Sequence, residues 1–314
     1  MKRYTIIFFC ILFFLFFIYS WFAIPQTMSR FLLLLNNTSA GLSSKSMKTP
    51  LGNIHYLEGG KKGVHTETIV LLHGIFARKE HWVDLARELT PYFRVIALDL
   101  PGFGDNKQLG FEHYLLSHQK QNLLIVLDAL EIESAHFGAN SMGAAVAALM
   151  AATRPDLLRS LTFIGSPLGV DSLIQSDMQV AIANGQYPLL VESEKEFEIR
   201  NQWLFPKTPA IPSPILRTWM KQELKTVDHN KQIWLAANSF VSTPKLLDLA
   251  PTLELPTLIL WCQEDRIFHV SGADLLHEAL PNSQREILNN SGHIPMLDKP
   301  KQIADLYLDF LLRP

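Results

Sequence analysis

The chain has 314 residues, 48% of them hydrophobic and 18% charged, which is enough material for one large core. Its formal net charge of −2 and the lack of a basic tract argue against a nucleic-acid partner. Its two cysteines, Cys10 and Cys262, lie far apart, so the sequence offers no disulfide framework.

An apolar run opens the chain. Residues 6–24 contain no charged side chain, and as a helix rising about 1.5 Å per residue they would span about 29 Å, close to the hydrocarbon thickness of a bilayer. We therefore predict a single-pass membrane anchor over residues 1–26. Lys2 and Arg3 favour a cytoplasmic N-terminus, which would place the catalytic part of the chain on the non-cytoplasmic side.

A cleaved signal peptide is the main alternative to an anchor, and a buried core helix is a third. The apolar region of a signal peptide is usually shorter, and Trp21 and Phe22 stand where cleavage requires small residues. Tyr19 and Trp21 also suit the aromatic belt of a membrane interface. The juxtamembrane segment, residues 27–50, includes "MSRFLLLLNN", which is too short to span again. We expect it either to pack on the body of the protein or to lie on the lipid surface.

Residues 51–166 and 256–314 alternate between two kinds of segment. Short segments rich in Val, Ile and Leu, such as "ETIVLLHG" and "LRSLTFIGS", are typical of strands buried in a parallel sheet, and the segments between them have helical spacing. This alternation predicts a doubly wound, mostly parallel α/β sheet. Residues 167–255 break the pattern with helical patches and prolines, which predicts a helical cap over the crevice where such folds bind ligands.

Ser141 lies in "AHFGANSMGAAVAALMAA", where a strand would turn into a helix. Ala139 and Gly143 occupy the outer positions of the nucleophile-elbow pattern, a sharp turn that lifts the serine hydroxyl above the sheet and crowds its neighbours. The small residues around Ser141 are therefore explained by backbone crowding, although Ala139 departs from the usual glycine. An ordinary serine N-cap is the alternative.

Two residues downstream complete a triad in the order Ser, acid, His that this pattern requires. Asp265 follows the strand-like "TLILWC", and His293 lies in a loop after "SQREILNN", so both fall just beyond strand ends. We predict Ser141 as nucleophile, His293 as general base and Asp265 as the acid that orients it. Asp171, which follows "LTFIGS", is the alternative acid.

An oxyanion hole needs two backbone N–H groups aimed at the developing negative charge. We expect one from Met142, the residue after the nucleophile, and one from Ile75 in the loop "HGIFARKEHW", with Phe76 as a close competitor. His73 in the same loop is interpreted as structural. The candidates for contact with substrate are aromatic or apolar and can equally be core residues: Phe76, Trp203, Leu204, Phe205 and Trp219.

Five segments together resemble the α/β-hydrolase superfamily, and within it they are most similar to membrane-anchored monoacylglycerol lipases and related bacterial lipases and esterases. They are "LLHGIFARKEHW", "VIALDLPGFGDN", "GANSMGAAVA", "ILWCQEDRIFHVSGADLL" and "NNSGHIPMLDKP". The resemblance covers residues 51–312 apart from the insertion. It departs at Ala144 and Cys262, where many relatives have glycine. It implies the same triad and oxyanion roles as above.

The sequence thus predicts a serine hydrolase that cleaves carboxylic esters of acylglycerols, monoacylglycerol foremost, through an acyl-enzyme. We expect no metal or other cofactor, because the sequence has no H-E-x-x-H or cysteine–histidine cluster and the glycines after Pro101 belong to a turn. The expected partners are a lipid or small acyl-ester substrate and the membrane. The alternatives are a carbon–carbon bond hydrolase of ring-fission products on the same fold, and a catalytically silent membrane-tethered binding protein.

Overall fold

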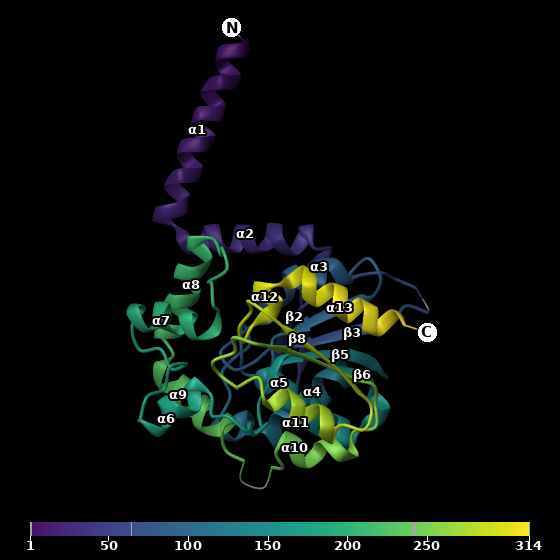
Figure 1. The fold of residues 1–314 in the computed structure, drawn as a ribbon. Helices are drawn as coiled ribbons and strands as arrows, with labels where there is room; N and C mark the ends of the chain where they lie inside the picture. The colour runs from purple at the N-terminus through teal and green to yellow at the C-terminus, as the bar shows by residue number, and fades with distance from the viewer. Residues whose placement is uncertain (1, 64, 241–242, 314) are drawn as a thin grey trace.

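A mostly parallel sheet forms the centre of the protein (Figure 1). The computed structural model describes residues 2–63, 65–240 and 243–313, without the side chains of residues 2, 3 and 13. Within these residues the sheet has eight strands in the order β1-β2-β4-β3-β5-β6-β7-β8, and the pairings from β4–β3 to β7–β8 are parallel. The strands are β1 (Leu42–Thr49), β2 (Gly52–Gly60), β3 (Thr68–Leu72), β4 (Arg94–Leu98), β5 (Ala135–Asn140), β6 (Leu158–Pro167), β7 (Thr257–Cys262) and β8 (Ser283–Leu288).

Helices cover both faces of the sheet, so the predicted doubly wound architecture is confirmed (Figure 1). One face carries α3 (Val83–Leu89) and α13 (Pro300–Leu312), and the other carries α4 (Leu116–Ala129), α5 (Ser141–Thr153) and α11 (Gly272–Ala279). Strands β3, β5 and β7 are buried at every residue because both of their faces are covered. The short helical elements are η1 (Lys79–Trp82), η2 (Phe111–Tyr114), η3 (Pro155–Leu157), η4 (Ala250–Thr252) and α12 (Pro295–Asp298).

The sheet begins earlier than the sequence indicated. Strand β1 falls inside the segment predicted as juxtamembrane, residues 27–50, and pairs antiparallel with β2 from Leu42 to Thr49. Its residues are mostly polar and exposed because β1 lies at the edge of the sheet. The sheet therefore includes residues before 51, the position at which the sequence predicted the core to begin.

The cap consists of helices inserted between β6 and β7. They are α6 (Asp177–Ala183), α7 (Glu194–Leu204), α8 (Ser213–Leu224), α9 (Val227–Ala237) and α10 (Leu246–Leu249), and all of them lie in the segment predicted as a cap. The first four gather beyond one end of the sheet (Figure 1). The cap thus lies where the parallel strands end at their carboxyl termini, which positions it over the catalytic candidates.

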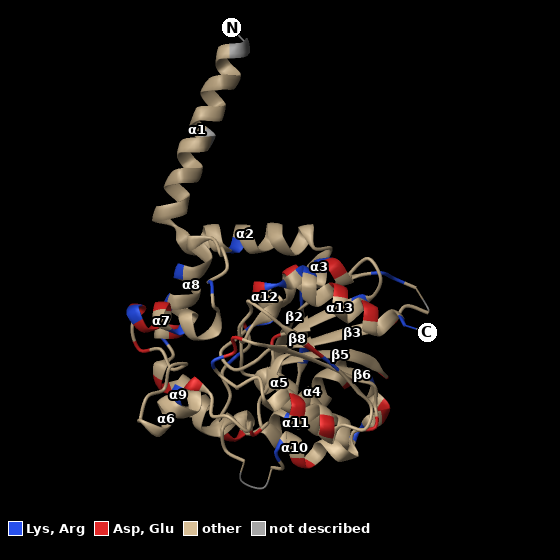
Figure 2. Ribbon diagram, in the orientation of Figure 1, with Lys and Arg blue, Asp and Glu red and all other residues tan. Residues whose placement is uncertain are grey.

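The N-terminal helix α1 (Lys2–Ala23) projects away from the body (Figure 1). Its segment Tyr4–Ala23 is the one helix in the described residues that is long and apolar enough to cross a membrane. Figure 2 shows many charged residues along the body of the protein, whereas residues 4–23 of α1 have none. A helix with apolar side chains exposed along most of its length is suited to a lipid environment.

Helix α2 (Pro25–Ser39) lies across the body and not parallel to α1 (Figure 1). Its side toward the body buries Met28 and Asn37, whereas Phe31, Leu34 and Leu35 are exposed. The interpretation that this segment packs on the protein agrees with the buried side, and the exposed apolar side is the one to which the lipid-surface prediction applies.

Candidate active site

Ser141 is the first residue of α5 and directly follows β5. Its φ of 52° lies in the left-handed region, which costs a non-glycine residue about 1–3 kcal/mol and is found at strained functional turns. A Cβ on Gly143 would lie 2.5 Å from the His73 carbonyl oxygen, and one on Gly74 would lie 2.9 Å from the Ser141 Cβ. The crowding expected around Ser141 is therefore present, and it comes from the neighbouring strand.

His293 and Asp265 are joined by a hydrogen bond beside Ser141. His293 Nδ1 lies 3.0 Å from Asp265 Oδ2, both residues are buried, and His293 lines the same cavity as Ser141. The other carboxylate oxygen, Oδ1, accepts bonds from the backbone N–H groups of Ile267 at 2.8 Å and Phe268 at 3.1 Å. A proton on His293 Nδ1 leaves Nε2 free to accept the proton of the serine hydroxyl.

Ser166, at the end of β6, is a member of this site that sequence reasoning missed. Its hydroxyl donates to Asp265 Oδ2 at 2.5 Å and lies 2.9 Å from His293 Nδ1. The alternative acid, Asp171, is not in this network, because it is mostly exposed and pairs with Lys245. The signal available in the sequence was position alone, since Ser166 lies one residue before the end of β6, and β6 pairs with β5, the strand that leads into Ser141.

The loop that carries His293 is fixed from two directions. The Asn140 side-chain amide donates to the carbonyl oxygens of Ile164 at 2.8 Å and His293 at 3.1 Å. The His293 N–H donates to the carbonyl oxygen of Leu204, the last residue of the cap helix α7, at 2.9 Å. A Cβ on Gly292 would lie 2.3 Å from that same oxygen, so this close contact with the cap requires glycine.

The candidate oxyanion donors lie on either side of Ser141. Met142 is the second residue of α5, and the first N–H groups of a helix have no intrahelical partner. Within the described residues, the Ile75 and Phe76 N–H groups likewise form no hydrogen bond in the loop after β3. Phe76 adopts a φ of 56°, so this loop is strained at its tip.

The loop that carries Ile75 is held in place by His73 and Lys79. The His73 ring accepts from the Leu100 N–H at 3.0 Å and bonds the Gly74 carbonyl at 2.7 Å, an arrangement that requires neutral imidazole. Burial lowers the pKa of His73 to about 4, so the ring is neutral near pH 7. Its interpretation as structural agrees with these contacts.

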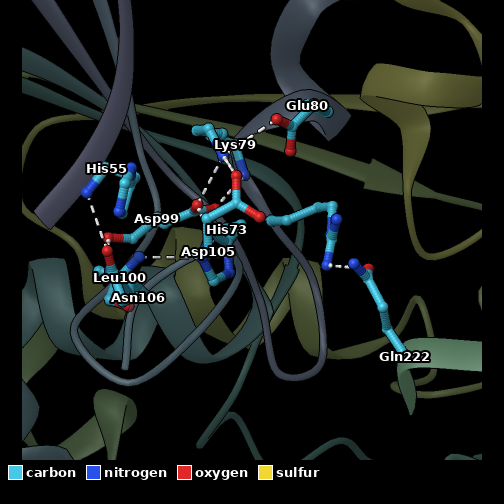
Figure 3. Close-up of polar contacts among 10 residues, drawn as sticks. His55, His73, Lys79, Glu80, Asp99, Leu100, Asp105, Asn106 and Gln222 are labelled. Carbon is cyan, nitrogen blue, oxygen red and sulfur yellow. Dashed lines mark hydrogen bonds and ion pairs between the residues drawn. The ribbon is translucent and has the colours of Figure 1, made fainter. Parts of the chain in front are cut away.

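Figure 3 shows Lys79 surrounded by three carboxylates. Its ammonium lies 2.8 Å from Asp99, 2.6 Å from Asp105 and 3.0 Å from Glu80. These ion pairs raise the pKa of Lys79 despite its burial. Removing any one partner would leave a charge in this cluster poorly compensated. The three ion pairs therefore hold Lys79, and with it the end of the loop that carries Ile75, in place.

Three cavities meet near Ser141. The nucleophile cavity, about 60 Å³, is lined by Ser141 and His293. The apolar cavity, about 230 Å³, shares Ile75, Ser141 and Leu189 with it, and extends between the cap and residues of the 265–268 loop. The polar cavity, about 400 Å³, shares four residues with the nucleophile cavity: Phe76, Ala77, His81 and Arg200. The serine therefore lies between an apolar and a polar chamber.

The predicted substrate contacts separate into two groups. Phe76 lines both the nucleophile and the polar cavity, and Trp219 lines the polar cavity. Trp203 instead stacks under Arg266, whose guanidinium lies 4.2 Å from the ring centroid. Phe205 is buried in the core on the α13 face of the sheet. Neither Trp203 nor Phe205 is among the described residues that line the three cavities. Leu204, the last residue of α7, lies between them in sequence and lines the nucleophile cavity.

The chain is similar to proteins of known family and of known structure. The family model described as alpha/beta hydrolase fold matches residues 67–300. Monoacylglycerol lipase ABHD6 from Bos taurus is 26% identical over 80% of this chain and 77% of its own. Lipase 1 from Psychrobacter immobilis is 27% identical over 86% of this chain and 84% of its own. The crystal structure of a membrane phospholipase A, a bacterial virulence factor, is 30% identical, covers 99% of this chain and 98% of its own, and has a TM-score of 0.87. The chain belongs to the α/β-hydrolase fold family.

Proposed function

We propose that this chain, a carboxylic ester hydrolase by its relatives, is a membrane-anchored serine hydrolase that cleaves acylglycerol esters, monoacylglycerol foremost. The observation that carries the proposal is the His293–Asp265 hydrogen bond, which orients the imidazole in the cavity that Ser141 lines. The apolar cavity next to Ser141 supports the lipid substrate, since it offers room for an acyl chain.

The reaction would run in two halves. Ser141 attacks the ester carbonyl while His293 takes its proton, and the N–H groups of Met142 and Ile75 stabilise the oxyanion. The alcohol leaves with the proton from His293, and water then attacks the acyl-enzyme by the same route. Asp265 holds the imidazole in the required tautomer throughout and is not itself protonated.

Labelling with a fluorophosphonate tests the proposal. The intact chain should be labelled and should hydrolyse monoacylglycerol, and Ser141→Ala should abolish both, with kcat falling on the order of 10⁴ to 10⁶. Ser172→Ala, which changes an exposed hydroxyl that bonds the Ile174 carbonyl, is the matched control and should keep full activity. A Ser141→Ala chain with a tenth of the activity would exclude this residue as nucleophile. An unlabelled, inactive wild-type chain would favour a binding protein, and activity only on a dienol-ketone would favour carbon–carbon cleavage.

A further inference from the structure

The loop after β3, which carries the proposed oxyanion donor Ile75, is tied to the hydrolase core by polar contacts at its two ends. At the start, the His73 ring makes two hydrogen bonds to the backbone. At the end, the Lys79 N–H donates to Asp99 Oδ1 at 2.8 Å, and its ammonium is held by three carboxylates. Residues 74–78 lie between these two fixed points, so the orientation of the Ile75 N–H depends on contacts of another kind.

The backbone of this middle part supplies little restraint of its own. Within the described residues, the N–H groups of Ile75 and Phe76 form no hydrogen bond, and the Ala77 N–H reaches the Gly74 carbonyl oxygen only at 3.4 Å. Phe76 has a φ of 56°, and strain of this kind persists only where the surrounding structure restrains it. Apolar packing of Ile75 and Phe76 is non-directional and does not by itself aim an N–H group. A directional contact near Ile75 is therefore needed.

Arg78 makes a directional contact from this loop to the cap. Its Nη2 donates to Oε1 of Gln222 at 3.1 Å (Figure 3), and its guanidinium carbon lies 5.4 Å from the ring centroid of Trp219. Gln222 and Trp219 are three residues apart on α8, so they share one face of that helix. Arg78 forms no ion pair within the described residues, so its charged group is directed at the cap and not at a carboxylate of the core.

Trp219 contacts the same segment a second time, at His81 in η1. The two ring centroids lie 5.4 Å apart, with 59° between the ring planes. Burial, with help from the nearby Arg78, lowers the pKa of His81 to about 3, so the ring is neutral near pH 7. Helix α8 thus touches the chain on both sides of Lys79, through a charged group before it and an uncharged ring after it.

Arg78 also lines the polar cavity, together with Trp219 and Gln222. A direct contact with the alcohol part of an ester is therefore the alternative role for its guanidinium. The two roles predict different kinetics. A contact made equally by bound substrate and transition state acts on KM, whereas a restraint on an oxyanion donor acts where negative charge develops, and so acts on kcat.

We propose that Arg78 is a positioning residue for ester hydrolysis: by binding α8, it holds the loop so that the Ile75 N–H faces the oxyanion formed at Ser141. This inference rests on the proposed function, and it gives α8 a part in the reaction beyond enclosing the substrate. Displacement of α8 away from the loop releases the guanidinium and removes the restraint on Ile75. The cap helix is then one of the elements that complete the oxyanion hole.

A double-mutant cycle in the full-length chain tests this assignment. The variants are Arg78→Met, Gln222→Met and the two together, because methionine keeps the length of both side chains and removes their hydrogen bond. Lys221→Met, which removes an equal charge from an exposed residue of the same helix, is the control. The substrates are methyl butyrate and monobutyroylglycerol, which are soluble and share one acyl group, so only the alcohol differs. Thermal melts check that each variant is folded.

We expect Arg78→Met to lower kcat about tenfold on both esters, about 1.4 kcal/mol in activation free energy, with KM within about twofold. This is less than the 10²- to 10³-fold cost of losing an oxyanion donor outright, because the N–H is loosened and not removed. Gln222→Met should lower kcat about fivefold in the wild-type background and should have no further effect in Arg78→Met, since both changes break one contact. Lys221→Met should match the wild type.

Several results would overturn the assignment. A loss confined to monobutyroylglycerol, or a raised KM at unchanged kcat, would mean that Arg78 binds the alcohol directly. Wild-type kcat in either single variant, or losses that multiply in the double variant, would mean that Arg78 does not act through α8. Each of these outcomes leaves ester hydrolysis in place, whereas a wild-type chain inactive on both esters and unlabelled by a fluorophosphonate would reject the proposed function itself.

Discussion

Asp265→Asn is the substitution that most directly tests the catalytic geometry. The backbone N–H groups of Ile267 and Phe268 donate to Oδ1, so the remaining oxygen of an asparagine stays there and its NH₂ group takes the place of Oδ2. That NH₂ group lies against His293 Nδ1, where it must donate, and the imidazole is then locked with its proton on Nε2. The ring can no longer accept the proton of Ser141.

With its proton on Nε2, His293 cannot act as the base, and such a loss lowers kcat by roughly 10⁴, which is about 5 kcal/mol in the activation free energy. KM should change little, because Asp265 does not contact the ester. The assay is kcat on an aryl ester, with a thermal melt to confirm that the variant is folded. Asp171→Asn, which removes an exposed carboxylate paired with Lys245, is the control and should keep most of the activity. If Asp265→Asn kept a tenth of the activity, or if Asp171→Asn were the more damaged variant, the assignment of the acid would be incorrect.

Three further predictions concern the supporting structure. Ser166→Ala should lower kcat about 10- to 100-fold at unchanged KM, because a hydrogen bond to a charged carboxylate contributes about 1.5–3 kcal/mol; wild-type kcat would show that Ser166 has no positioning role. Deleting residues 2–24 should keep aryl-ester turnover within about threefold and reduce hydrolysis of vesicle-borne monoacylglycerol about tenfold or more, since the effective concentration at the bilayer is lost; equal rates on vesicles would show that α1 serves only to direct the protein to its compartment. The pKa of His73 is about 4 in the folded chain and 6.5 in the unfolded chain. Between these pH values the unfolded chain binds more protons than the folded chain does, so protons favour unfolding. The stability that the neutral ring contributes is therefore complete above pH 6.5 and is lost as the pH falls toward 4. The loss is about 3 kcal/mol, measurable by guanidinium unfolding, and a free energy of unfolding that does not fall over this range would contradict it.

The sequence was sufficient to predict the parallel core because those strands are apolar on both faces. Strand β1 was missed because its side chains, including Lys45 and Lys48, are those of an exposed edge strand, which resembles a polar linker in sequence. Pairing with β2, which defines it as a strand, is a contact between segments and leaves no periodic signal of its own.

The triad candidates were predictable because each follows a strand, and the carboxyl ends of parallel strands meet at one edge. Ser166 was not, because its place in the site depends on which neighbours the fold brings to it. Trp203 and Phe205 are a different case: their size suggested a substrate wall, and the structure places Trp203 against Arg266 and Phe205 in the core.

Helix α2 connects three parts of the molecule: α1, the cap helix α8 and helix α3 on the sheet. At its start, the Pro25 carbonyl accepts a bond from Thr218 of cap helix α8, and at its end Asn36 accepts one from Arg87 of α3. Its 15 residues make a rod of about 22 Å with the membrane helix joined to one end. Helix α2 thus links the cap to the sheet through contacts at its two ends. An outward movement of α8 must therefore either break the Thr218–Pro25 hydrogen bond or carry the start of α2 with it, so opening of the cap is coupled to the helix that joins α1 to the body.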